Sequence, residues 1–323
     1  MKILLVLLLL CPSISFGAKL FDIVGCTAPS TTVCNSVIDT INSSLPATDL
    51  SSLTQNFADA AVISQRGLGA DYASDLKAIA IGGGVGLGAT LGGASIFDLL
   101  KSSGGVTLPG LGFGSSLMLG LNMSFLNGDF WKRSNVYINM AVLNPPSSLG
   151  INGKFSSFGM HIQYKLVPAL SVGLGTFSFG GVVLTTGFEK SSSLLTISQD
   201  LSIPTYLTAT IDVGTDVKAY SIPLEVSSNV NLFYFMTIFG GLGLDYNWGT
   251  SKSVSDVKNF SLAGGLNGTP TINVAPDASP KALTSRYFIG LQFDILAFKI
   301  SLQYNSNIGS GGVGLTIGTK ILF

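Results

Sequence analysis

The last stretch of the chain, GGVGLTIGTKILF (Gly311–Phe323), decides the fold class. Apolar side chains occupy every second position from Val313 to Phe323, with Thr319 as the departure, and most positions between them hold Gly, Thr or Lys. Successive side chains of a β-strand point to opposite faces of the sheet. The stretch therefore predicts a strand with one apolar face and one small or polar face.

The same alternation recurs through most of the chain that precedes this strand. It predicts further strands at about 77–88, 112–125, 133–143, 155–166, 170–189, 204–213 continuing toward 217–228, 232–248, 284–295 and 298–306. The interval 190–228 fits either one long return strand or an additional hairpin. We therefore predict an all-β, antiparallel structure of about 10–12 strands, with 14 possible, because bacterial single-chain barrels have even counts.

The composition separates a membrane barrel from other classes of protein. Lys and Arg number 17, Asp and Glu number 17, and only 11% of the chain is charged, against about 25% in a typical soluble domain. Mean hydropathy is +0.52. These values exclude a disordered chain and argue against a nucleic-acid-binding protein, which needs a basic surface. They also argue against a soluble β-sandwich, whose outer faces need charge.

A transmembrane β-barrel places the apolar face in lipid and the polar face in the lumen. The positions of Tyr164, Tyr246, Trp248, Tyr287 and Tyr304 near strand ends on the apolar face favour this architecture, because barrels carry interfacial aromatic girdles. The uncharged run 78–97 is the best candidate for a membrane helix, yet seven of its residues are Gly, which destabilises a helix interior. We interpret these glycines as strand positions that permit strong curvature or close approach of a plug.

The N-terminal region differs from the barrel region. Residues 1–17 predict a cleaved signal peptide, with Lys2, an apolar core at Ile3–Leu10 and small residues at Ser15 and Gly17. Lipoprotein processing at Cys11 is the alternative, although Leu10 and Pro12 flank it poorly. The mature chain then keeps Cys26 and Cys34, which predict one disulfide in an exported protein.

Three domains follow from this pattern. Residues 1–17 are the signal peptide, 18–75 a small helical segment that either plugs the barrel or lies in the periplasm, and 76–323 the transmembrane barrel. Helical spacing is present at Val33–Ser43 and from Asp49 to Ile63. We expect extracellular loops at 89–110 and 249–283, and periplasmic turns at 167–169, 229–231 and 296–297.

The C-terminal strand resembles the insertion signature of Gram-negative outer-membrane proteins, which end in an aromatic residue preceded by alternating apolar residues. Leu315, Ile317, Ile321 and Phe323 match it. The resemblance implies location in the outer membrane, contact with its lipid, and recognition by the barrel-assembly machinery as a partner. A polar N-terminal segment before a barrel is also similar to the long-chain fatty-acid transporter family. The chain departs from that family in lacking an Asn-Pro-Ala hatch motif and in its smaller strand count.

The polar face of the predicted strands defines the candidate lumen. By alternation it contains Asn122, Asn139, His161, Gln163, Lys165, Asp212, Glu225, Asp245, Asn247, Gln292, Asp294, Lys299, Gln303, Asn305 and Lys320. Charges of both signs can pair with one another to fill a narrow barrel, or they can line a path for a solute. Porins with open channels have 16–18 strands, so a smaller barrel with an internal segment leaves little open lumen.

Three functions remain open at this stage. The first is passage of a small or hydrophobic solute through a plugged or narrow barrel. The second is a structural, adhesin-like surface barrel that displays loops 89–110 and 249–283. The third is a lipid hydrolase that uses His161, the one histidine of the chain. A metal site built on histidine is excluded by number, and Gly82–Gly93 lacks the Gly-Lys-Ser/Thr ending of a phosphate loop. We predict no cofactor.

Overall fold

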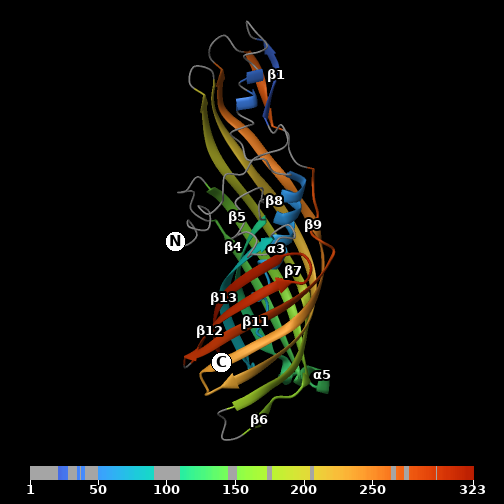
Figure 1. The fold of residues 1–323 in the computed structure, drawn as a ribbon. Coiled ribbons are helices and arrows are strands. Elements are labelled where there is room, and N and C mark those ends of the chain that lie inside the picture. The colour runs from blue at the N-terminus through green and yellow to red at the C-terminus, as the bar shows by residue number, and fades with distance from the viewer. Residues whose placement is uncertain are drawn as a thin grey trace.

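The computed structural model describes residues 21–27, 35–36, 38–40, 50–90, 110–144, 151–172, 177–203, 207–262, 267–272, 276–295 and 297–323 (Figure 1). The predicted signal peptide, most of loop 89–110 and the side chains of Cys26 and Cys34 lie outside these residues, so the disulfide stays a prediction. Within the described residues, the model has no helix long and apolar enough to cross a membrane.

One antiparallel sheet dominates the molecule and closes on itself. Its order is β5-β4-β3-β2-β13-β12-β11-β9-β8-β7-β6, and an additional pairing of β5 with β7 completes the ring. Since β6 pairs only with β7, ten of the eleven strands form the ring. These ten are β2 (Ile79–Thr90), β3 (Gly110–Asn122), β4 (Ser134–Leu143), β5 (Ile151–Val167), β7 (Phe177–Ile203), β8 (Leu207–Leu232), β9 (Met236–Leu262), β11 (Leu283–Ile295), β12 (Phe298–Asn307) and β13 (Gly312–Leu322).

The predicted barrel is therefore confirmed, with ten strands. The region 190–228 is a long return, in which β7 runs to Ile203 and β8 starts at Leu207. Two short helical elements, η1 (Met123–Phe125) and α5 (Asp129–Lys132), connect β3 to β4.

Several predicted connections were wrong. Residues 249–283 are not one loop, because β9 continues to Leu262 and β10 (Asn267–Ile272) follows. The turn expected at 229–231 lies at Phe233 and Tyr234, which have positive φ values of 55° and 66°. Residues 167–169 do not reverse the chain, because β6 (Leu170–Val172) continues beside the same strand, β7. Alternation alone does not mark where a strand leaves the membrane, so turns were placed too early.

Strands β7, β8 and β9 are much longer than the others. They contain 27, 26 and 27 residues, whereas β2, β3, β4, β11, β12 and β13 contain 10 to 13. About 9–11 residues span a bilayer as a tilted strand. The three long strands therefore project beyond the barrel, and we call residues 191–203, 207–219 and 249–262 the extension. At its far end β1 (Phe21–Thr27) pairs with β10 (Figure 1).

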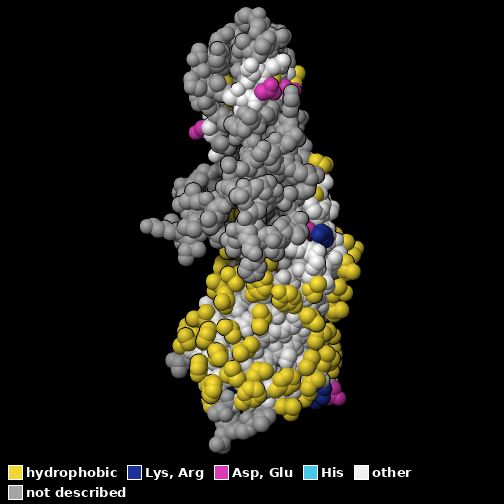
Figure 2. Space-filling model, in the orientation of Figure 1, with side chains coloured by type: hydrophobic (Ala, Val, Ile, Leu, Met, Phe, Trp, Pro, Cys, Tyr) yellow, Lys and Arg dark blue, Asp and Glu magenta, His cyan; other side chains and the backbone are white. Residues whose placement is uncertain are grey.

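The outer surface of the barrel is apolar. Large hydrophobic side chains are exposed there, such as Leu117 at 69% and Leu242 at 64%, and Figure 2 shows them covering the barrel below the extension. The ring of Tyr220 stacks on that of Trp248 at 5.7 Å where the extension begins, and Phe130 stacks on Tyr164 at 5.2 Å near the opposite end. This belt with aromatic borders is the surface that a transmembrane barrel turns to lipid.

The connections give the barrel an orientation. The turns between β8 and β9 and between β11 and β12 are short and lie at the end where the C-terminal strand stops, opposite the extension (Figure 1). Outer-membrane barrels have short periplasmic turns and longer extracellular loops. The molecule has the architecture of an outer-membrane β-barrel, and the extension projects from the end opposite the short turns.

Candidate functional site

The lumen of the barrel is occupied by the segment that precedes β2. Helix α3 (Leu50–Ile63) contacts β2, β3, β8, β9 and β13, and the chain after it continues past Leu68 to Leu76 with almost every side chain buried. We call residues 54–76 the plug. Residues 54–76 of the predicted N-terminal segment thus lie inside the barrel, whereas β1 lies at the far end of the extension.

Glycine on two wall strands allows α3 to approach the sheet. A Cβ atom added to Gly112 on β3 would lie 2.2 Å from the carbonyl oxygen of Ala60, and one added to Gly86 on β2 would lie 2.1 Å from that of Ser64. Gly114 faces Ser64 in the same way, at 2.4 Å. No side chain fits between helix and wall at these positions. For Gly86, which lies in the glycine-rich run 78–97, this is the close approach of a plug that the sequence predicted; Gly112 and Gly114 lie outside that run.

Two buried arginines, Arg66 of the plug and Arg286 of the wall, share a cluster of carboxylates at the middle of the lumen. Arg66 of the plug donates from Nη1 to Glu189 and from Nη2 to the Ser221 hydroxyl at 2.6 Å, and its Nε lies 3.3 Å from Asp245. Arg286 of β11 donates to the same Asp245 at 2.9 Å and to Glu225. Both arginines are 1% exposed. Removing one partner of such a buried pair costs about 3–5 kcal/mol, because the other charge is left without compensation.

Further contacts fix the plug nearer the end of the barrel with the short turns. Tyr72 donates its hydroxyl to Glu225 at 2.6 Å, and Asn122 donates an amide hydrogen to the carbonyl of Leu76 at 2.6 Å. Asp71 forms an ion pair with Lys320 of β13. The plug is thus held at several levels by side chains of different wall strands.

Most sequence-predicted lumen residues lie in this interior. The buried ones are Asn139, His161, Gln163, Glu225, Asp245, Asn247, Gln292, Gln303, Asn305 and Lys320. Four others are only half-buried: Asn122, Lys165, Asp294 and Lys299. Lys165 pairs with Asp75 at 2.6 Å, and Lys299 with Asp294 at 2.7 Å.

Asp212 is the exception, and its placement in the lumen was wrong. It lies in the extension, at an even-numbered β8 position like Tyr220 on the outer face, and Lys258 donates to it at 2.5 Å. That hydrogen bond lowers the pKa of the Asp212 carboxyl and raises the pKa of the Lys258 amine. A period of two puts position 212 on the opposite face of β8 from Glu225, and the strand has already left the membrane there, where a charge is tolerated on the outer face.

Sequence reasoning missed three charges of the central cluster. Glu189 shares the inward positions of β7 with Thr185, and Arg286 shares those of β11 with Phe288 and Gln292. Both residues continue the pattern in which every second side chain of their strand points inward, so that pattern could have identified them. Arg66 lies in a turn of the plug, where no periodicity indicates its direction.

His161 does not have the surroundings of a nucleophilic site. Its Nε2 lies 3.4 Å from Glu189, the side chain is 2% exposed, and a Cβ at Gly69 would come within 2.4 Å of its ring. In the described part of the chain no hydroxyl group hydrogen-bonds to either ring nitrogen. The same residues contain no cluster of three metal-binding side chains.

One side of the lumen carries buried polar atoms that lack protein partners among the described residues. They are the hydroxyl of Tyr137, Oδ1 of Asn139, both nitrogens of His161, and the hydroxyls of Thr185 and Ser227. The backbone register places Tyr137 opposite His161, and Gln163 opposite Thr185, so these atoms follow neighbouring strands from β4 to β8. Buried polar atoms of this kind are usually bonded to water.

A comparison of the sequence with protein-family profiles identifies the family of this chain. The profile of a family described as Lsa36-like matches residues 24–323. No curated protein matches. Among solved structures, the translocator domain of the autotransporter NalP from Neisseria meningitidis is similar at 12% identity and a TM-score of 0.35, covering 91% of this chain and 98% of its own.

Two further solved structures are similar at the same remote level. The COG4313 outer membrane channel from Pseudomonas putida F1 has 9% identity and a TM-score of 0.33, covering 78% of this chain and 98% of its own. The toluene transporter TodX from Pseudomonas putida has 6% identity and a TM-score of 0.26, covering 81% and 98%. No functional property is transferred from them.

Proposed function

The chain belongs to the Lsa36-like family, and from that premise we propose that its plugged barrel anchors a surface-exposed interaction module, the extension, at the outer face of the membrane. The observation that carries this proposal is the pairing of a filled lumen with three strands that continue outward. In β7, residues 191–203 extend for about 40 Å at roughly 3.3 Å per residue.

The chemistry of the extension suits contact with a macromolecule in water. Its described outward and rim positions include Asp200, Asp216, Lys218, Lys252, Asp256 and Lys258, whereas the lipid-facing belt holds apolar side chains. Strands β7 and β8 pair without a break from Val217 to Leu207, and β8 pairs with β9 over the same stretch with one irregularity between Thr208 and Thr210, so the surface is preorganised. Preorganisation supports binding because less conformational entropy is lost on association.

The plug supports an anchoring role for the barrel. The central cluster pairs Arg66 and Arg286 with Glu189, Asp245 and Glu225, and all of these side chains are buried. Opening this lumen would require these buried ion pairs to break, which leaves charges without partners. The contacts therefore favour a rigid anchor over an open pore.

Removing the extension tests this proposal. Ser193 lies opposite Val217, and Ser251 opposite Ala278, so residues 194–216 and 252–277 can each be replaced by a short turn. We expect the truncated protein to keep its heat-modifiable mobility on gels. Cells that display it should lose adhesion to immobilised extracellular proteins and glycans that bind cells with the full chain. Equal adhesion of both would contradict the proposal.

Passage of a small or hydrophobic solute is the second candidate. The row of unpartnered polar atoms from Tyr137 to Ser227 favours it, because such a row suits a file of water beside the plug. Planar-bilayer conductance of the full chain and of a variant without residues 18–75 tests this idea. Large conductance only after removal supports a gated path; no conductance in either contradicts it.

We also propose that β13 guides assembly and that the signal peptide directs export. Leu315, Ile317 and Phe323 are exposed on the lipid side of β13, which supports recognition of this strand by the barrel-assembly machinery. The variant Phe323→Ala should lower the amount of folded protein in the outer membrane, and unchanged yield would contradict this role.

A further inference from the structure

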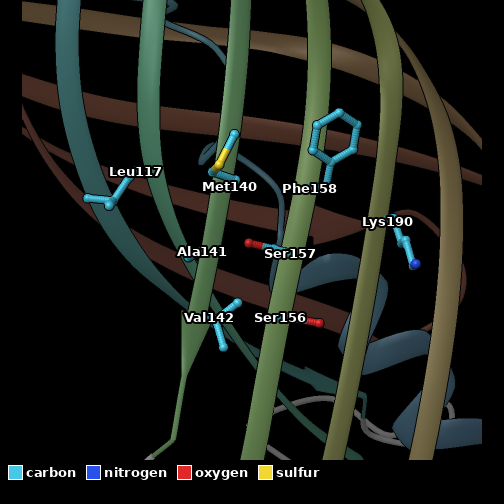
Figure 3. A pocket seen from close by; sticks show the side chains of 8 residues that line it. All are labelled: Leu117, Met140, Ala141, Val142, Ser156, Ser157, Phe158 and Lys190. Carbon is cyan, nitrogen blue, oxygen red and sulfur yellow. The ribbon is translucent and has the colours of Figure 1, made fainter.

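A groove on the outer surface of the barrel lies next to a group of lysines. The groove has a volume of about 380 Å³ and is lined by Leu117, Met140, Val142, Ser156 and Phe158, with Lys190 at its rim. In Figure 3 these side chains come from β3, β4, β5 and β7, and α3 lies behind the strands. The groove therefore faces the membrane and not the plugged lumen.

The backbone register arranges these residues in order. Leu117 lies opposite Met140, Met140 opposite Phe158, and Phe158 opposite Lys190. The same row continues through Tyr220 to Trp248. The row thus passes from apolar residues to a cation and then to the aromatic border of the lipid belt. Val142 is next to the last residue of β4, which places the groove toward the extracellular end of the barrel.

Two more lysines lie above Lys190 on the same face. Lys218 lies opposite Ser192, so it is a diagonal neighbour of Lys190, about 7–8 Å away between backbones. Lys154 lies opposite Leu194. All three lysines are exposed, and none of them has a carboxylate within salt-bridge distance among the residues that the structure describes. The one acid on this part of the face, Asp216, lies opposite Lys252 of β9.

The contacts of Lys190 hold its charge at this border. Its amine lies 5.9 Å from the centre of the Tyr220 ring, whose neighbour is Trp248. Aromatic rings attract cations through their faces. The charge is consequently kept beside the apolar groove, at the depth where lipid headgroups begin.

We propose that this site binds a lipid of the outer leaflet that carries more than one phosphate. One acyl chain fills the groove between Met140 and Phe158, and the phosphates contact Lys154, Lys190 and Lys218. Three cations spread over three strands exceed what a single phosphate needs, whereas several phosphates on one headgroup match them. Clusters of basic residues beside the membrane are recognised as sites for anionic lipid headgroups.

A second groove on the same barrel serves as an internal comparison. It has a volume of about 430 Å³ and is lined by Val230, Ile238, Gly240, Tyr287 and Ile289, with no basic side chain among its lining residues. Its size is similar, yet it lacks the cations. It should accept any acyl chain and show no preference for phosphate.

Native mass spectrometry of the full chain, refolded in detergent, tests the proposal. The probes are lipid A with two phosphates, lipid A with one, and phosphatidylcholine. We expect affinity to fall in that order. The variant Lys154→Ala/Lys190→Ala/Lys218→Ala should bind the doubly phosphorylated probe about a hundredfold more weakly, at about 1 kcal/mol for each lysine. The control Lys252→Ala should bind like wild type, because Lys252 already pairs with Asp277 at 3.1 Å.

A second variant tests the acyl half of the site. Ser156→Trp would fill the groove without removing a charge, and it should weaken binding of the same probe. All substituted side chains lie on the outer face, so heat-modifiable mobility should remain. Equal affinity of the triple variant and wild type, or equal binding of phosphatidylcholine and doubly phosphorylated lipid A, overturns the proposal. Unchanged binding by Ser156→Trp overturns the role of the groove.

Discussion

The two halves of β8 show one alternation with opposite chemistry. Below Tyr220, even-numbered positions such as Ile222, Leu224 and Val226 are exposed and apolar, while inward positions such as Glu225 and Ser227 are polar. Above it, toward the tip of the extension, most inward positions are buried and apolar, namely Leu207, Ala209, Ile211, Val217 and Ala219, with Thr215 as a polar exception, and outward positions include Thr208, Thr210, Asp212, Asp216 and Lys218.

This inversion follows from a change of solvent along a single strand. Lipid surrounds the lower half, so apolar side chains face outward and the polar ones pair with the plug. Water surrounds the upper half, so apolar side chains face inward, where Val217 and Ala219 pack on Ala61 and Val62 of α3. The comparison shows that Tyr220 and Trp248 mark a physical boundary and not the end of a strand.

The largest expected loss of stability comes from a substitution in the membrane-spanning half of the molecule. Arg286→Ala should destabilise the barrel by about 3–5 kcal/mol, because Glu225 and Asp245 lose a buried partner. The midpoint of unfolding in urea, followed by gel mobility, measures this. The exposed pair of Lys252 with Asp277 provides the control, and Lys252→Ala should change stability by about 0–1 kcal/mol. Similar losses of stability in both variants would contradict the difference between the buried ion pairs of the barrel and the exposed ones of the extension.

A charge placed on the outer face of β8 tests the boundary directly. Leu224→Lys puts a cation in the lipid belt and should cost about 2–4 kcal/mol. Thr208→Lys makes the same change on the same face of the extension, and we expect about 0.5 kcal/mol or less, because water solvates it. Reversible unfolding from lipid vesicles compares the two. Equal costs would mean that the extension is also in lipid.

A substitution at one of the glycines that face α3 should destabilise the protein less and more locally. Gly112→Leu should cost about 1–3 kcal/mol, because even its Cβ would overlap the carbonyl of Ala60 and push α3 from the wall. Increased protease cleavage within the plug would report the displacement. The control is Gly318→Ala on β13, where the nearest atom to an added Cβ is the Ser301 hydroxyl at 3.1 Å. A plug that stays protected in Gly112→Leu would contradict this role.

The smallest effect concerns acid stability of the extension. The Lys258 hydrogen bond lowers the Asp212 pKa from its ordinary 3.8, so its stabilisation is present above that pH. It is lost as the pH falls through the lowered value. The protection of the amides of residues 210–213 against hydrogen exchange, taken relative to the rate of an unfolded chain at the same pH, should therefore fall below about pH 3.8 in wild type. In Asp212→Asn the exchange should already be faster at pH 7 and respond less to acid. Identical pH profiles would contradict this.

Much of the fold was predictable because lipid imposes a simple rule on sequence. The apolar face of Gly311–Phe323 and the aromatic residues at strand ends indicated the barrel, and the inward list contained Glu225, Asp245 and Asn247 of the central cluster. Arg66 was not predictable, since it lies in a turn without periodicity and its partners are distant in sequence. The continuation of β9 to Leu262 was hidden for a different reason: the extension alternates with inverted chemistry, and it was read as a loop.

The alternation in the sequence is enough to predict a barrel and most of the inward side chains of its membrane-spanning part, because a strand has a period of two and lipid favours apolar side chains. The filling of the lumen by residues 54–76 and the continuation of β7, β8 and β9 into the extension become visible only in the folded molecule. Both depend on contacts between distant segments, such as Arg66 with Glu189 and Ala60 against Gly112. Local periodicity carries no information about such contacts.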